Sequence, residues 1–130
     1  MVIKMLAQSS IIAFIATTRP QQAKAFYSEV LGLQLKEDSP FVLVYAANGT
    51  MLRIQKVEKL PVTGYTALGW KVSDIQETVE WLQNRGIRFN HYPGLQQDEI
   101  GIWVAPGGDK VAWFNDPDGN ILSLIEFRSD

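Results

Sequence analysis

The sequence contains no cysteine, a single histidine, no cluster of basic residues and no long hydrophobic run. The absence of cysteine excludes disulfide bonds, thiol nucleophiles and zinc sites built on cysteine. No group of lysines and arginines is long enough to follow a phosphate backbone, and the net charge is −2, so nucleic acid is not an expected partner. No apolar run approaches the length of a membrane-spanning helix, so a membrane is not expected either.

Acid–base groups of the kind used in catalysis are sparse. His91 can act as an acid or base near neutral pH, but it lies in a stretch of loop-forming residues, 90–94, which favours a surface position. No Ser/His/Asp arrangement and no phosphate-binding glycine loop are present, and the pair Gly107-Gly108 is typical of a hairpin turn. The composition therefore favours binding over catalysis.

The chain has the composition of one globular domain. It has 130 residues, of which 46% are hydrophobic and 20% charged, enough to form a core. Residues 4–16 are rich in apolar side chains, as a signal peptide is, but the polar stretch 8–10 interrupts them. We interpret this region as a short tail followed by the first strand, and we expect a cytoplasmic location.

The first half of the chain predicts the order β-α-β-β-β. A helix begins at Pro20, carries apolar residues at three- and four-residue spacing, and ends at Gly32. The pair Asn48-Gly49 is a strong hairpin signal. Strands are predicted over 11–17, 33–36, 41–46 and 51–55.

The second half is predicted to repeat this order, with five strand candidates for its four strands, after an exposed connection over 56–64. Its helix begins with capping and acidic residues after Ser73, has an apolar stripe of Val79, Leu82 and their neighbour Trp81, and ends at Gly86. Strands are predicted over 67–72, 87–89, 101–105, 110–114 and 121–127. The segment 115–120, Asn-Asp-Pro-Asp-Gly-Asn, predicts a tight turn between the last two.

The two halves match each other at one fixed offset. Tyr27 corresponds to Trp81, Gly32 to Gly86, Leu33 to Ile87 and Leu35 to Phe89. A single domain, 1–130, is therefore expected to consist of two similar modules, one over about 9–57 and one over about 65–128.

Three segments together resemble the glyoxalase, bleomycin resistance protein and extradiol dioxygenase (vicinal oxygen chelate) superfamily. They are the helix end 26–33 (FYSEVLGL), the second helix end 82–87 (LQNRGI) and the turn 114–120 (FNDPDGN). The resemblance implies an α+β fold in which two βαβββ modules form a curled mixed sheet around a cup, with the helices on the outer face. It also implies a homodimer, for which Trp81 and Tyr65 are candidate contact residues. The reaction does not follow from the fold.

The resemblance also implies positions for the ligands of a divalent cation. These positions fall on Ile12, Arg53, Ala67 and Ser123, with Thr66 as the neighbour if the register differs by one. Aliphatic groups have no lone pair, a guanidinium accepts no bond, and one serine hydroxyl does not hold a divalent metal. No metal or other cofactor is therefore predicted, although non-standard ligands stay an alternative.

Glu126 is the one carboxylate close to these positions in the last strand. It lies three residues beyond Ser123, a shift that places it on the opposite face of the strand. We interpret it as a solvated or capping charge.

The strand period predicts which side chains face the cup. Phe14 alternates into it with Ile12, and Arg53 can pair there with a carboxylate or phosphate of a ligand. The alternative for Arg53 is a packed stem with its charge in water. Trp103 and Trp113 can stack on a planar ligand or simply fill a core or a subunit contact. The candidate ligand-binding residues are Phe14, Arg53, Trp103, Trp113 and Ser123.

Three functions stay open from the sequence. We expect a metal-free protein that binds an apolar or aromatic molecule with a negative group, as resistance-type members of the superfamily do when they sequester a drug. The enzyme alternative is a metal-dependent lyase or dioxygenase of the glyoxalase type with non-standard ligands. A third alternative is an assembly module whose cup is filled by its own side chains.

Overall fold

The computed structural model describes residues 5–129. The chain divides into two compact units, one up to Leu60 and one from Pro61 on. This boundary falls within the predicted connection, 56–64. After a 3-10 turn at Leu6–Gln8, each unit contains one helical segment and one four-stranded sheet. Among residues 5–129, no helix is long and apolar enough to cross a bilayer.

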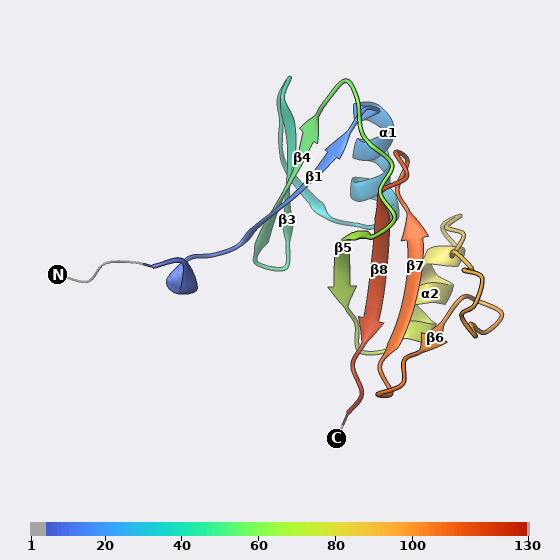
Figure 1. Ribbon diagram of the computed structural model, residues 1–130. Coiled ribbons are helices and arrows are strands. Elements are labelled where there is room, and N and C mark those ends of the chain that lie inside the picture. Colours follow the sequence, from blue (N-terminus) through green and yellow to red (C-terminus); the bar gives the residue numbers. More distant parts are fainter. Residues whose placement is uncertain (1–4, 130) are drawn as a thin grey trace. The chain divides into compact units, whose positions relative to one another are not determined.

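The first unit has the predicted order β-α-β-β-β (Figure 1). The strand order in its sheet is β1-β4-β3-β2, with β1 parallel to β4 and the other pairs antiparallel. The tight turn between β3 and β4 has positive φ at Asn48 (48°) and Gly49 (87°), which confirms the hairpin prediction. The elements are β1 (Ile12–Thr17), α1 (Pro20–Ala25), a π-helical turn (Phe26–Val30), β2 (Gln34–Asp38), β3 (Val42–Ala47) and β4 (Thr50–Lys56).

The spacing predicted a regular α-helix in this unit, but the last turn of the helix departs from α-helical geometry. The backbone N–H of Leu31 donates to the carbonyl of Phe26, five residues earlier, at 2.9 Å, so the last turn is wider. Gly32, with φ of 76°, then ends the helix, and the N–H of Leu33 returns to the carbonyl of Tyr27 at 2.9 Å. The glycine stop is therefore confirmed, whereas the regular α-helix up to that stop is not.

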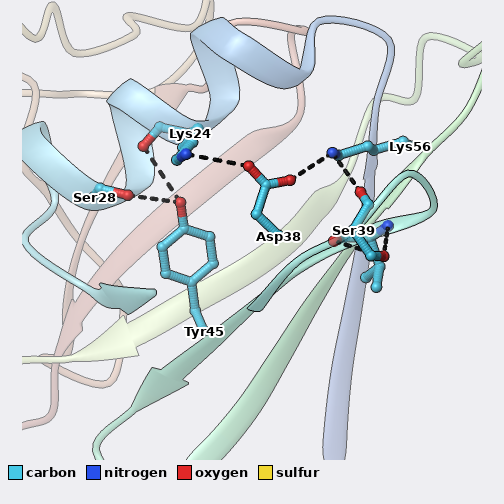
Figure 2. A network of polar contacts seen from close by, with 7 residues as sticks. Lys24, Ser28, Asp38, Ser39, Tyr45 and Lys56 are labelled. Carbon is cyan, nitrogen blue, oxygen red and sulfur yellow. Dashed lines mark hydrogen bonds and ion pairs between the residues drawn. The ribbon is translucent and has the colours of Figure 1, made fainter. Parts of the chain in front are cut away.

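The helix packs against one face of its sheet. The register of β1, β3 and β4 places the buried side chains of Ile15, Leu43, Tyr45, Leu52 and Ile54 on that face. The Tyr45 hydroxyl lies 2.8 Å from that of Ser28 and donates to the carbonyl of Lys24 at 3.3 Å, as Figure 2 shows. Burial raises the pKa of the Tyr45 phenol above its ordinary value. The neutral hydroxyl therefore ties the helix to the sheet.

The second unit repeats the arrangement. Its strand order is β5-β8-β7-β6, with β5 parallel to β8, and its helix lies on one face of the sheet (Figure 1). The Asp74 carboxylate caps the helix by accepting the N–H of Glu77 at 3.0 Å. The elements are β5 (Thr66–Lys71), α2 (Ile75–Gln83), β6 (Trp103–Val104), β7 (Lys110–Asn115) and β8 (Ile121–Glu126).

The strand predicted over 87–89 is wrong. Gly86 has φ of 91°, and the N–H of Ile87 donates to the carbonyl of Leu82 at 3.1 Å, so these residues end the helix. Only Phe89 pairs with β7, through an isolated bridge to Phe114. The fourth strand of this unit is β6, after a long loop.

Trp81 does not belong to the apolar stripe of α2. The buried residues of the helix are Ile75, Val79 and Leu82, whereas Trp81 is 43% exposed. The guanidinium carbon of Arg85 lies 4.0 Å from the centre of its ring, in cation–π geometry. Trp81 is therefore a surface aromatic residue, as the expectation of a subunit contact requires.

The turn between β7 and β8 is held by a buried carboxylate. Asp116 is 6% exposed and accepts the backbone N–H groups of Asp118 and Asn120, each at 2.9 Å. Gly119 has φ of 86°, a conformation that glycine adopts without strain. The predicted strand, turn and strand are confirmed.

An ion-pair network fixes the end of β2 to α1 and β4 (Figure 2). Asp38 accepts the ammonium groups of Lys56 at 2.7 Å and Lys24 at 3.1 Å. Lys56 also donates to the carbonyl of Ser39 at 2.6 Å. The hydrogen bond from Lys56, and next that from Lys24, hold the pKa of the Asp38 carboxyl below its ordinary value.

This network predicts an acid-sensitive contribution to stability. Because the pKa of Asp38 is lower in the folded than in the unfolded state, its contribution is present above the ordinary aspartate pKa and is lost as pH falls through the folded value. Carboxyl NMR titration should show a larger rise of the Asp38 pKa in Lys56→Met than in Lys24→Met. An equal or reversed order would contradict the assignment of Lys56 as the stronger partner.

Candidate functional site

Each sheet has one face that its own helix does not cover, here called the helix-free face. In the first unit this face carries Ile12, Phe14, Met51 and Arg53, because the parallel register pairs Ile12 with Met51 and Phe14 with Arg53. Its apolar side chains are largely exposed: Ile12 is 45%, Phe14 54% and Met51 42% exposed. The predicted alternation of β1 is therefore confirmed, and it leaves large apolar side chains in contact with solvent.

Arg53 is the cation of this face. It is half-buried, and its Nη1 lies 3.9 Å from the sulfur of Met51, a weak acceptor. Within residues 5–129, Arg53 forms no ion pair with a carboxylate. A guanidinium presents several donors in a planar fork, so this one can accept an anionic group of a ligand beside the ring of Phe14.

The helix-free face of the second unit is aromatic. The register pairs Trp113 with Ser123 and Trp103 with Val111, which places both tryptophans on this face. Their ring centroids are 6.1 Å apart, and both side chains are half-buried. Ser123 is 4% exposed, so little of its hydroxyl is available to a ligand. The structure thus groups three of the five predicted residues in this unit and two, Phe14 and Arg53, in the first.

The backbone of β5 approaches Ser123 closely at Gly69. These two residues pair across the parallel strands, and a Cβ atom placed on Gly69 would lie 2.6 Å from the Ser123 hydroxyl oxygen and 3.3 Å from its carbonyl oxygen. Only glycine fits this position without a shift of Ser123.

A small cavity beside Trp113 contains residues that the sequence analysis did not select. Its volume is about 240 Å³, and it is lined by Gly64, Tyr65, Thr66, Tyr92, Trp113 and Ile121. The Tyr92 ring meets Trp113 edge to face, with centroids 5.5 Å apart. Tyr92 was missed because no periodic pattern marks its loop; its place depends on the bond from the N–H of Asn90 to the carbonyl of Trp113, at 2.8 Å. His91, by contrast, is exposed, as predicted.

The positions where the resemblance implies metal ligands do not suit a divalent cation. Ile12 and Arg53 lie on the helix-free face of the first unit and Ser123 on that of the second. Ala67 has no partner in the ladder between β5 and β8, because the register shifts between Thr66 and Leu68; its neighbour Thr66 pairs with Ile121. Two hydroxyl groups are the only oxygen donors that these side chains supply, and one of them is almost fully buried. The residues do not fit the metal.

Acidic residues do not replace these ligands. Within the described part of the chain, no three His, Cys, Asp or Glu side chains form a group that could hold a metal ion. Glu126 accepts the N–H of Ile75 at 2.9 Å, at the start of α2, and lies 3.8 Å from the ammonium of Lys110. This confirms the interpretation of Glu126 as a capping charge on the helix side of the sheet.

Two larger grooves are lined mainly by polar residues, and each contains an ion pair. One, of about 510 Å³, includes Glu126 and Lys110; the other, of about 620 Å³, includes Lys24, Asp38 and Lys56. The Asp38 carboxylate accepts hydrogen bonds from Lys24 and Lys56, and Glu126 lies 3.8 Å from the ammonium of Lys110. The aromatic and apolar side chains suited to a small organic ligand lie on the helix-free faces instead.

Comparison with known proteins gives a family match over most of the chain. The sequence model of the Glyoxalase/Bleomycin resistance protein/Dioxygenase superfamily matches residues 9–124. No curated protein matches the chain at a significant level.

Solved structures with the same fold include both enzymes and binding proteins. A glyoxalase family protein from Bacillus anthracis has a TM-score of 0.74 at 16% identity, covering 97% of this chain and 100% of that one. TnmS3, an antibiotic binding protein from Streptomyces sp. CB03234, has a TM-score of 0.70 at 24% identity, covering 96% of this chain and 100% of that one. Lactoylglutathione lyase from Agrobacterium tumefaciens has a TM-score of 0.69 at 19% identity, covering 91% of this chain and 93% of that one. At these identities the similarity shows the fold alone.

The close approach of β5 and β8 generates a stability prediction. Gly69→Ala should destabilise the protein by about 1–3 kcal/mol, because the new methyl group overlaps the Ser123 hydroxyl. In a Ser123→Ala background the same change should cost clearly less, since the nearest atom is gone. Chemical denaturation of the four proteins of this cycle measures the coupling, and additive effects would contradict the contact.

Proposed function

Because this chain belongs to the glyoxalase/bleomycin resistance protein/dioxygenase superfamily, we propose that it is a small-molecule binding protein that works without the superfamily's usual metal site. Its ligand is apolar or aromatic and carries a negative group. The single domain 1–130, made of two modules, sequesters this ligand in the manner of resistance proteins.

The observation that carries this proposal is the pairing of Arg53 with Phe14. A guanidinium without a carboxylate partner in residues 5–129 stands beside the exposed side chains of Phe14 and Met51. A cation beside apolar surface matches a ligand that combines a hydrophobic body with an anionic group. A carboxylate is a better fit than a metal, because the cation already occupies the position where a metal ligand would be needed.

The helix-free face of the second unit supports an aromatic ligand. Trp103 and Trp113 present two neighbouring rings, on which a planar molecule can stack. TnmS3, which shares the fold, is an antibiotic binding protein. The alternative is that these two rings only pack against their neighbours. In that case, replacing Trp103 or Trp113 would change the stability of the protein and not its affinity for a ligand.

An enzymatic function is the alternative proposal. Lactoylglutathione lyase from Agrobacterium tumefaciens shares the fold, and a lyase or dioxygenase of this kind would require metal ligands other than Ile12, Arg53, Ala67 and Ser123. Turnover that appears only after addition of Mn, Fe, Ni or Zn would favour the enzyme over the binding protein.

We also propose that the protein is a homodimer. Tyr65 and Trp81 are 68% and 43% exposed, so both rings are available to a second copy of the chain. Light scattering after size-exclusion chromatography should give twice the chain mass at micromolar concentration. A single monomeric mass at that concentration would contradict the proposal.

Arg53→Ala should weaken the binding of an anionic aromatic probe by about tenfold, the weight of a charge-assisted hydrogen bond. The probe is 2-naphthoate, and its neutral analogue 2-naphthamide should bind almost equally to both proteins. Calorimetric titration measures both affinities.

Arg88→Ala, which removes an exposed arginine from the second unit, is the matched control and should leave both affinities unchanged. Thermal unfolding should show that the fold survives Arg53→Ala, since the side chain makes no ion pair within the described residues. An unchanged affinity for 2-naphthoate would remove Arg53 from the site.

A further inference from the structure

The cavity beside Trp113 has an aromatic wall and no charged residue. Trp113, Tyr92 and Tyr65 provide three rings, and Ile121 and Thr66 complete most of the lining. Its volume of about 240 Å³ is below the range of about 300–1,000 Å³ typical of sites for drug-sized ligands. The cavity therefore suits one or two fused rings, either as a whole ligand or as the end of a larger one.

Hydrogen bonds hold both the backbone and the hydroxyl group of Tyr92 in place. Its backbone N–H donates to the side-chain oxygen of Gln97 at 2.7 Å. The amide nitrogen of Gln97 in turn donates to the carbonyls of Asn90 and Gly101, each at 2.8 Å. The loop around Tyr92 is thus held together by one glutamine, which fixes the ring in edge-to-face contact with Trp113.

The hydroxyl of Tyr92 is oriented by Asn90. The amide nitrogen of Asn90 donates to the Tyr92 oxygen at 3.1 Å and to the side-chain oxygen of Asn115 at 2.6 Å. The Tyr92 oxygen therefore acts as an acceptor here, which leaves its own proton to be donated elsewhere. Among residues 5–129 the Tyr92 hydroxyl donates to no acceptor.

We propose that Tyr92 determines specificity at this cavity by donating its hydroxyl proton to a carbonyl or similar acceptor on a planar aromatic ligand, whose ring packs against Trp113. The inference rests on the proposed binding function and adds the class of ligand. The bond from Asn90 strengthens the donation, because a hydroxyl that accepts one hydrogen bond donates a stronger one. No charge on the ligand is required at this cavity, since none of its lining residues is charged.

The experiment compares two neutral probes of the same shape. Coumarin has two fused rings and a ring carbonyl, and 2H-chromene has a methylene group in place of that carbonyl. Titrations followed by tryptophan fluorescence should show that the native protein prefers coumarin. Tyr92→Phe should weaken coumarin binding by about three- to tenfold, the value of one neutral hydrogen bond, and leave 2H-chromene binding unchanged.

Arg88→Ala, which lies outside the cavity, is the control and should change neither affinity. Tyr65→Phe removes the hydroxyl of the other tyrosine of the cavity and should weaken coumarin binding less than Tyr92→Phe does, because no hydrogen bond orients the Tyr65 hydroxyl among residues 5–129. The preference of the native protein for coumarin is a second readout that does not depend on the folding of any variant. Equal affinity of the native protein for both probes, an equal effect of Tyr92→Phe on both, or no saturable binding of either would overturn the inference.

Failure here is distinguishable from failure of the proposed function. Neither probe is charged, so Arg53→Ala should leave coumarin binding unchanged. If Arg53→Ala leaves 2-naphthoate binding unchanged while the preference for coumarin persists, the anionic site is contradicted and the role of Tyr92 stands. If Arg53→Ala weakens 2-naphthoate binding but coumarin is not preferred, the anionic site stands and the role of Tyr92 is contradicted.

Discussion

The parallel pairing of the first and last strands of each unit is the constraint on which the rest of the structure depends. β1 pairs with β4, and β5 with β8. In each unit the helix follows the first strand and covers one face of the sheet that the remaining strands complete. The opposite face is then left for other contacts. Every ligand-binding residue predicted from the sequence lies on such a helix-free face.

The same pairing carries different chemistry in the two units. In the first it sets an arginine beside a phenylalanine, whereas in the second it brings Gly69 against Ser123 so closely that no Cβ fits. Arg53 and Ser123, both on the last strand of their unit, therefore contribute a cation and a buried hydroxyl. Two similar scaffolds have thus come to present one charged and one aromatic surface, as expected when function resides in side chains and not in the fold.

The sequence predicted the fold because its signals are local. Gly32 and Gly86 end the helices, Asn48-Gly49 forms the hairpin, and the alternation of β1 separates its two faces. The predictions failed where no periodic pattern marks the bonds that position a residue. Ile87 ends the helix by donating its N–H to Leu82, and the loop of Tyr92 is held by bonds that Asn90 donates to the carbonyl of Trp113 and Tyr92 to Gln97. Arg53 and the two tryptophans lie in strands, as predicted, because the strand signals around them are local.

We propose that this member of the superfamily recognises its ligand without a divalent cation. The affinity for 2-naphthoate, measured in the presence of EDTA and again after addition of Mn²⁺, Ni²⁺ or Zn²⁺, decides this together with the metal content of the purified protein. We expect equal affinities and far less than one metal ion per chain. Stoichiometric metal, with binding that EDTA abolishes and added metal restores, would contradict it.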